Sequence, residues 1–355
     1  MAQTAKRAAI ATLVVIGIFA AALALWKLRL VIALLFLGIT IAAAMRPGID
    51  WLRRWGVPRG IGLLVHYVAL FGLLTLLLWV AVPRALTQVE SALGTKGLPT
   101  SAKDLRQAAS HSHGIKRKIL VSLQKRLEHL PRASKLFQSG VTAGVKAFEI
   151  LVGIFFVFAT AGYWIFERGR AVDFVTSLLP RPRRRKVRDT WNLIALKLGA
   201  FVRGEAILIL LVATVLSLLF ALIGEPYWIL IGAFAGMVEI VPVIGPIAAG
   251  ALAVGAGFTV SWHTALYAGI CVLAVRLAED YLIVPRVLGD AVGLSPLLVL
   301  VSVTAVGILF GGFAVILAVP LAAVLSTLVD VVVRDRNPAE QDVPAVLFPA
   351  KEAER

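Results

Sequence analysis

Two apolar segments near the C-terminus are too long to cross a membrane as single straight helices. Residues 228–258 and 294–333 would extend about 46 Å and about 60 Å as continuous α-helices, whereas the hydrocarbon core of a bilayer is about 30 Å thick. Both segments contain prolines and glycines, which interrupt helices. We therefore expect two bent or re-entrant elements inside a membrane protein.

The composition of the whole chain also indicates a membrane protein. Hydrophobic residues make up 59% of the 355 residues and charged residues only 16%, whereas about a quarter of a soluble domain is charged. Apolar runs separated by charged stretches are typical of a chain with several membrane-crossing helices. The predicted fold is all-α, a polytopic transmembrane bundle of about eight spans with broken or re-entrant helical segments in its C-terminal half.

The apolar runs divide the chain into regions. In order, we expect N-terminal transmembrane helices (1–83), a polar, partly amphipathic loop domain (84–146), a C-terminal transmembrane transport core (147–333) and a disordered tail (334–355). The uninterrupted runs lie near 8–26, 30–45, 61–83, 147–166, 206–223 and 263–284. Basic loops are expected between them at 46–59, with Pro47–Gly48 and Pro58 as helix breakers, and at 167–203. Pro83 and Arg84 are expected to end the third run.

The distribution of lysine and arginine predicts the orientation of the chain. The short loop 46–59 carries four of these residues and 167–203 carries ten, and such residues favour the cytoplasmic side. Both termini are then cytoplasmic and 84–146 lies outside the cytoplasm. The net charge of +16 is explained by this bias and by anionic head groups of the bilayer, which is the expected partner, rather than by nucleic acid.

The polar stretch 84–146 carries 12 Lys or Arg residues and three acids. Apolar residues between 115 and 130 recur at helical spacing, with most basic residues off that face. One interpretation is an interfacial helix or a cap that binds a partner. The other is a small helical hairpin that packs on itself.

Charged residues within the apolar segments are candidates for function. Glu239 can bind a proton or a cation, accept a hydrogen bond from a substrate hydroxyl, or serve as a structural carboxylate paired with an arginine. Arg276 is spaced to pair with Glu279 and Asp280 on one helix face. That group forms either a switchable polar cluster or an interfacial salt bridge at a helix end. Arg203 and Glu205 are interpreted as interfacial residues.

The predicted transport path combines these charges with the helix breaks. Freed backbone groups at membrane depth must face protein or a water-filled cavity, and such breaks are typical of transporters, although a structural proline kink is the alternative. The segment 228–258 either re-enters or crosses once with a kink. The path residues are Glu239, Pro242, Gly245, Pro246, Arg276, Glu279, Asp280, Pro285, Gly311, Gly312 and Pro320.

Several functions find no support in the residues. The chain has no phosphate-binding sequence of the Walker A type, which argues against ATP hydrolysis. No cluster of histidines and carboxylates suggests a metal, and Cys271 is the only cysteine. We expect no catalytic residues, no cofactor and no metal, and therefore no enzyme.

Three ordered motifs stand out in the C-terminal half of the chain. The first is Ile240-Val-Pro-Val-Ile-Gly-Pro246. The second is Asp280-Tyr-Leu-Ile-Val-Pro-Arg286, followed by Val292-Gly-Leu-Ser-Pro296. The third is Phe310-Gly-Gly-Phe313 with Leu317-Ala-Val-Pro-Leu-Ala-Ala323. With these motifs the chain resembles the autoinducer-2 exporter family of bacterial permease-like proteins. It differs from the family pattern at Val243, where tyrosine is frequent, and at Glu205, where glutamine is expected.

The resemblance implies a multi-pass secondary transporter of the bacterial inner membrane that forms a homo-oligomer. It implies export of small polar signalling molecules such as autoinducer-2 for some members, and sodium–proton exchange for others. The first hypothesis is therefore an exporter of small polar solutes or ions, and the second a cation–proton antiporter. A third, from another class, is a membrane scaffold without transport that recruits partners through 84–146.

Overall fold

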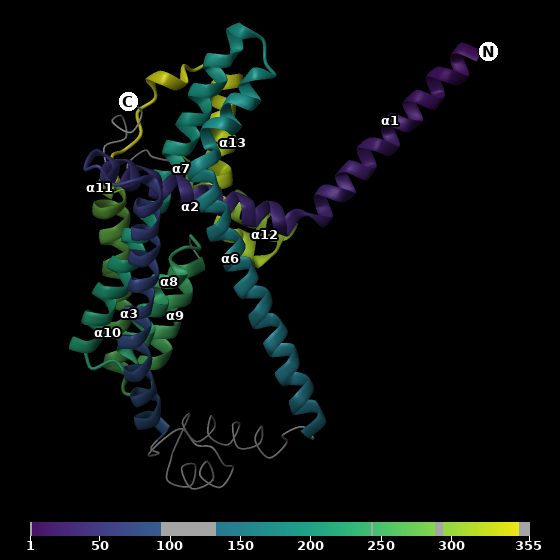
Figure 1. Ribbon diagram of the computed structural model, residues 1–355. Helices are drawn as coiled ribbons and strands as arrows, with labels where there is room; N and C mark the ends of the chain where they lie inside the picture. Colours follow the sequence, from purple (N-terminus) through teal and green to yellow (C-terminus); the bar gives the residue numbers. More distant parts are fainter. Residues whose placement is uncertain (1, 94–132, 243, 288–293, 348–355) are drawn as a thin grey trace.

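The computed structural model describes residues 2–93, 133–242, 244–287 and 294–347, and over these residues the chain is helical without β-strands (Figure 1). Five helices in this part are long and apolar enough to cross a membrane. Large apolar side chains are exposed along most of these helices, which suits a bundle whose outer surface faces lipid tails. The structure thus confirms the predicted all-α polytopic bundle.

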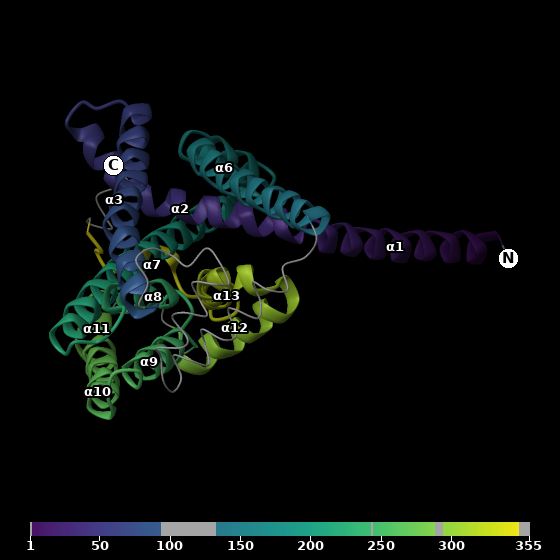
Figure 2. The ribbon, with the colours of Figure 1, turned by 90° about the horizontal axis from the view of Figure 1, so that it is seen from below.

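Long helices form the first part of the bundle. They are α1 (Ala2–Lys27), α2 (Arg29–Arg54), α3 (Arg59–Leu93), α6 (Ala133–Ser177) and α7 (Arg181–Leu222). Each contains one of the apolar runs expected to span the membrane. α2 contacts α3, α6 and α7, whereas α1 projects away from the other helices in both views (Figures 1 and 2).

The prediction of basic loops at 46–59 and 167–203 is wrong for most of their residues, because these residues are helical. α2 continues through Pro47 to Arg54, and α3 continues through Pro83. Within these two stretches, the chain leaves helical structure only at 55–58 and 178–180. A proline inside a helix loses one hydrogen bond and kinks the helix, but Pro47 is buried in the bundle, where packing against neighbouring helices offsets that loss.

The predicted loop domain 84–146 is described only at its two ends. Residues 84–93 belong to α3 and residues 133–146 belong to α6, so both ends extend transmembrane helices. The predicted amphipathic helix between 115 and 130 lies outside the described residues.

The first interrupted segment forms a re-entrant helical hairpin. α8 (Trp228–Val238) and α9 (Ile244–Gly257) contact each other. The turn that joins them lies part-way along the bundle, and their other ends lie together near the lower end of α10 (Figure 1). α10 (Trp262–Ala278) then runs back along the bundle. Of the two arrangements predicted for 228–258, the structure has the one in which the segment turns back on itself, and Pro246 lies in the first turn of α9.

The second interrupted segment also folds back on itself. α12 (Pro296–Phe310) ends at Gly311, and a short 3₁₀ helix, η2 (Gly312–Leu317), leads into α13 (Ala318–Val332), which contacts α12. Gly311 has a φ of 90°, which glycine adopts readily and other residues rarely. Pro320 lies in the first turn of α13, where a missing N–H costs little. The second arm changes from a 3₁₀ helix to an α-helix at Ala318, two residues before Pro320, so the arm is interrupted next to this proline.

The first hairpin packs against α7 and α10 through a core of small and branched side chains. Its buried members are Val212, Leu216, Phe220, Ile231, Ala235, Ala249, Ala253, Ala268 and Val275. Glycine permits the closest approach, because a Cβ atom on Gly232 would lie 2.1 Å from the Ser217 hydroxyl oxygen of α7. Small residues at such interfaces let helices approach closely in membranes, so this hairpin is held firmly on two sides.

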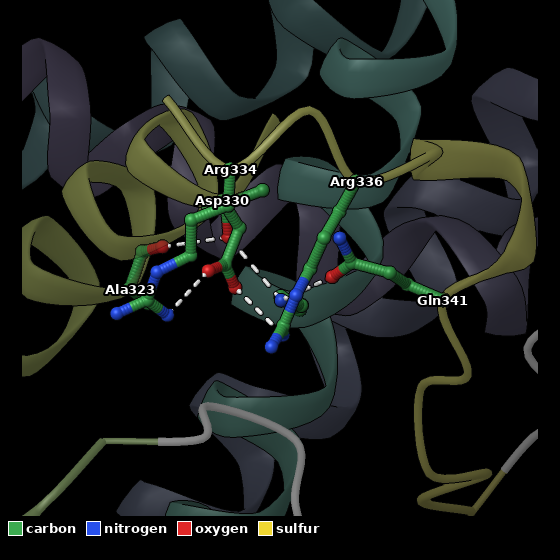
Figure 3. Close-up of polar contacts among 7 residues, drawn as sticks. Ala323, Asp330, Arg334, Arg336 and Gln341 are labelled. Carbon is green, nitrogen blue, oxygen red and sulfur yellow. Dashed lines mark hydrogen bonds and ion pairs between the residues drawn. The ribbon is translucent and has the colours of Figure 1, made fainter. Parts of the chain in front are cut away.

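The C-terminal tail is ordered up to residue 347, which corrects the prediction of a disordered tail over this part. A short 3₁₀ helix, η3 (Pro338–Glu340), follows α13, and Val346 is buried against Ala200 of α7. Figure 3 shows Asp330 between Arg334 and Arg336. Asp330 Oδ1 lies 2.9 Å from Arg334 Nη1, and Asp330 Oδ2 lies 3.5 Å from Arg336 Nη1. The segment 333–347 is thus bound to the bundle, and residues 348–355 lie outside the described residues.

Arg203 binds this tail to the helical bundle, and replacing Arg203 is expected to weaken that attachment. The buried Arg203 guanidinium donates from Nε to the Val346 carbonyl at 2.8 Å and from Nη1 to the Ala44 carbonyl at 3.1 Å. Arg203→Gln leaves both carbonyls without this donor, and each lost bond to a charged donor costs about 1.5–3 kcal/mol. We expect a lower unfolding temperature in detergent and faster proteolysis after residue 333. Arg185→Gln, at an exposed position of the same helix, is the control, and equal behaviour of the two variants would contradict this role.

The buried Glu225 is expected to make the stability of the folded protein depend on pH. It lies in the turn between α7 and α8, is 2% exposed, and neither carboxylate oxygen has a hydrogen-bond partner among the described residues. Burial raises the pKa of Glu225 to about 7. The folded protein therefore holds a proton that the unfolded chain has lost, so the free energy of unfolding falls as pH rises from about 4.5 to about 7, by at most about 3 kcal/mol.

Glu225→Gln removes this charge and should stabilise the protein selectively at high pH. We expect a higher unfolding temperature than the wild type at pH 8 and little difference at pH 4.5. Glu149→Gln, at an exposed position of α6, should change neither value. A gain of equal size at both pH values would show that the Glu225 charge is not the cause.

Candidate functional site

The turn between α8 and α9 places a carboxylate inside the bundle. Glu239 follows the last residue of α8 and caps that helix, and its backbone N–H donates to the Gly236 carbonyl at 3.3 Å. Pro242 lies in the same turn. Gly245 allows the chain to reverse tightly, because a Cβ atom there would lie 1.9 Å from the Val238 carbonyl oxygen. The motif identified from the sequence therefore forms the tip of the hairpin.

Arg276 of α10 connects this tip to the end of its own helix. Its Nη1 lies 2.9 Å from Glu239 Oε1 and 3.3 Å from Glu279 Oε2, and its Nη2 lies 3.0 Å from Asp280 Oδ1. The two contacts within α10 and its continuation follow the predicted helical spacing. The contact with Glu239 joins residues 37 positions apart. Pairing of Glu239 with an arginine was one of the interpretations of the sequence, which did not identify Arg276 as the partner. We call Glu239, Arg276, Glu279 and Asp280 the Arg276 cluster.

The Arg276 cluster contains more acidic groups than basic ones. The side chains of Glu239 and Glu279 are 8% and 4% exposed, whereas Arg276 is 32% exposed. One guanidinium therefore serves three carboxyl groups, and the cluster has an excess of acidic side chains.

A fourth carboxyl group faces the same region. Glu205 of α7 lies within electrostatic range of Glu239, Glu279 and Arg276. Glu205 was interpreted from the sequence as an interfacial residue, and in the structure it lies near the Arg276 cluster. The sequence did contain a signal for this role. Glu205 comes directly before a long apolar run, and an acidic residue next to a membrane-spanning segment is a candidate for function.

The helix that carries Arg276 changes its winding at the cluster. Residues Glu279–Ile283 form a π-helix, η1, and α11 (Val284–Val287) follows it. Pro285 of α11 has no N–H, so the Tyr281 carbonyl four residues earlier has no α-helical donor. Such π-turns occur frequently at functional sites. Here the wider turn carries Glu279 and Asp280, both of which pair with Arg276.

The predicted path combined the turn of the second hairpin with the Arg276 cluster, but the structure places that turn elsewhere. The Gly311–Gly312 turn lies beside the start of α2, where Arg29 Nη1 donates to the Leu309 carbonyl at 2.9 Å. The Arg29 guanidinium also lies 4.5 Å from the centre of the Trp26 ring. Among the predicted path residues, Gly311, Gly312 and Pro320 thus surround a separate helix break.

A further polar group, missed by the sequence analysis, joins α7 to the tail. Lys197 Nζ lies 3.1 Å from Gln341 Oε1 and 3.3 Å from the Thr327 hydroxyl of α13. Gln341 reaches this group from the ordered tail beside Asp330 (Figure 3). A lone lysine in a basic stretch gives no sequence signal for such a contact, since its partners lie more than 100 residues away.

Comparison with known proteins finds matches over most of the chain. The model of a protein family described as "AI-2E family transporter" matches residues 11–334. Two similar proteins come from Bacillus subtilis (strain 168). "Putative transport protein YrrI" is 24% identical over 299 residues, covering 83% of this chain and 84% of that protein. "Putative transport protein YueF" is 26% identical over 282 residues, covering 76% and 75%. "Putative transport protein MT0215" of Mycobacterium tuberculosis (strain CDC 1551 / Oshkosh) is 25% identical over 316 residues, covering 86% and 84%.

Proposed function

The chain belongs to the AI-2E family of membrane transporters, and on that premise we propose that it is a secondary exporter of small polar solutes coupled to proton movement. The observation that carries this proposal is the Arg276 cluster at the tip of a re-entrant hairpin. Broken helices at membrane depth are where secondary transporters bind substrates and coupling ions. Small signalling molecules rich in hydroxyl groups, such as autoinducer-2, are the proposed substrate class.

The charges suggest how a proton could be coupled to movement of the hairpin. When Glu239 is ionised, its ion pair with Arg276 fixes the α8–α9 turn to α10. Protonation of Glu239 weakens that pair, and Glu279 and Asp280 still satisfy Arg276. The released carboxyl group can then hydrogen-bond a polar solute. The proposed coupling step is this exchange of partners at Arg276.

A cation–proton antiporter is the second candidate, and the excess of carboxyl groups in the cluster favours it. Carboxylate oxygens attract hard cations as well as protons, although no three such side chains of the described residues are arranged to hold a metal ion, so a cation would pass the cluster rather than occupy a fixed site. The third candidate, a scaffold without transport, depends on 84–146, most of which lies outside the described residues. The same experiment separates all three.

The experiment uses the full chain reconstituted in sealed liposomes with an imposed pH gradient. An exporter moves autoinducer-2 or another small polyol against its gradient, whereas an antiporter moves sodium and changes the internal pH without such a solute. We expect Glu239→Gln to abolish the coupled flux, since the amide cannot exchange a proton. Glu167→Gln, in an exposed pair with Arg170, should retain it.

Two outcomes would contradict the proposal. Normal coupled flux in Glu239→Gln would mean that Glu239 is not the coupling residue. No flux of any tested solute or ion in the wild-type protein, together with capture of a partner by 84–146, would favour the scaffold.

The proposed setting is the bacterial inner membrane with both termini in the cytoplasm. The basic stretch that opens α7 supports this orientation. The exposed apolar surface of α1, which projects from the bundle, is consistent with the expected homo-oligomer. Labelling of cysteines introduced at the two termini, in intact and in opened cells, tests the orientation.

A further inference from the structure

A cavity of about 880 Å³ lies away from the Arg276 cluster, between α2, α6, α7 and α13. Its walls are mostly apolar side chains, including Phe36 and Ile39 of α2 and Ile194 of α7. Trp164 of α6 and Trp191 of α7 also line it, with ring centres 6.0 Å apart and ring planes inclined by 26°. Its volume falls within the range of about 300–1,000 Å³ that is typical of ligand sites.

The polar lining of this cavity is strongly basic. Arg46, Arg168, Arg183 and Lys186 line it, and no aspartate or glutamate of the described chain does so. These residues come from the end of α2, from α6 just before the 178–180 turn and from the start of α7. The cavity therefore has an apolar interior and a cationic side.

The neighbours of these cations leave part of the positive charge available. Arg46 pairs with Asp50 at 3.4 Å, and Lys186 pairs with Asp335 of the tail. Arg183 lines the cavity and has no ion pair among the described residues. A ligand with a negative charge would complete the site at Arg183.

We propose that this cavity binds one anionic phospholipid of the surrounding bilayer. The acyl chains fill the space beside Trp164 and Trp191, and the phosphate lies near Arg183 and Lys186. Basic pockets between transmembrane helices recognise anionic head groups in this way. The apolar walls favour a lipid over a soluble anion, because a small hydrophilic anion would leave most of the cavity surface without a partner.

The stacked tryptophans permit a direct measurement of this binding. Bromine atoms on an acyl chain quench tryptophan fluorescence on close approach, so phosphatidylglycerol with brominated chains is titrated into the full-length protein in detergent. We expect saturable quenching, whereas phosphatidylcholine with the same brominated chains should quench weakly and without saturation. Trp164→Phe/Trp191→Phe should lose the saturable part, which assigns the signal to the cavity.

A pair of charge variants tests the head-group contact. Arg183→Gln/Lys186→Gln removes two cations that line the cavity, and we expect phosphatidylglycerol to bind about tenfold more weakly or worse. Arg181→Gln/Arg185→Gln removes the same charge from neighbouring positions of α7 that do not line the cavity, and it should bind as the wild type does. Unfolding temperatures of both variants show whether they remain folded.

Competition with soluble glycerol phosphate separates the lipid from its head group alone. We expect millimolar glycerol phosphate to leave the quenching unchanged. Displacement of the lipid by glycerol phosphate, equal quenching by the two brominated lipids, or equal affinity of the two charge variants would each overturn the proposal.

Discussion

Replacing Arg276 with glutamine is expected to destabilise the protein and to abolish coupled transport. Arg276 is the cation that contacts Glu239, Glu279 and Asp280 at 2.9–3.3 Å. Removing one partner from a buried ion pair costs about 3–5 kcal/mol, because the other charge remains buried. Since Arg276 is 32% exposed, we expect a loss near the lower end of that range, measured by thermal unfolding in detergent.

A double variant shows whether uncompensated charge causes this loss. Arg276→Gln/Glu239→Gln removes one buried carboxylate together with its partner, so it should recover part of the stability that the single variant loses. Transport should remain absent in both, because the exchange of partners at Arg276 is gone. Arg286→Gln, at an exposed position shortly after the cluster, is the control for loss of an arginine. A double variant no more stable than Arg276→Gln would contradict the charge argument.

The apolar runs predict the membrane-crossing helices well but not where the helices end. Hydrophobicity marks only the part of a helix that lies in lipid. A loop was predicted around Pro47 because the residues there are basic. α2 continues to Arg54 because hydrogen bonding within the helix continues outside the hydrocarbon layer, and burial of Pro47 holds the kink. Charge patterns alone therefore locate membrane boundaries rather than helix boundaries.

The candidate site was predictable where it depends on local spacing. Arg276 lies three and four residues before Glu279 and Asp280, so their contacts follow from helical geometry. Glu239 and its prolines were recognisable as a helix break. The ion pair between Glu239 and Arg276, however, requires α8 and α9 to fold back beside α10. The sequence did not decide between a segment that re-enters and one that crosses once.

Other contacts carried no sequence signal. Arg203 was interpreted as interfacial, but it holds Val346 of the tail at a position 143 residues away. A polar tail has the composition of a disordered segment, and its order here depends on carbonyls that meet a buried guanidinium. Such contacts arise from tertiary packing, which residue types and periodicity do not encode locally.

Gly245→Ala is expected to disrupt the hairpin tip as severely as any single change outside the Arg276 cluster. A Cβ atom at this position would lie 1.9 Å from the Val238 carbonyl oxygen and 2.6 Å from its carbonyl carbon. Both are backbone atoms of the last residue of α8, so no side chain can rotate away. The α8–α9 turn must open, which moves Glu239 away from Arg276. We expect a large fall in unfolding temperature, together with loss of transport.

Gly255→Ala provides the matched control on the same helix. A Cβ atom at Gly255 meets nothing within 4 Å, and alanine favours helix by about 1 kcal/mol relative to glycine. This variant should therefore be as stable as the wild type or slightly more stable, and it should transport normally. If Gly245→Ala behaved like Gly255→Ala, the tight reversal at the hairpin tip would not be required. Loss of function in Gly245→Ala alone would instead tie transport to the geometry that brings Glu239 to Arg276.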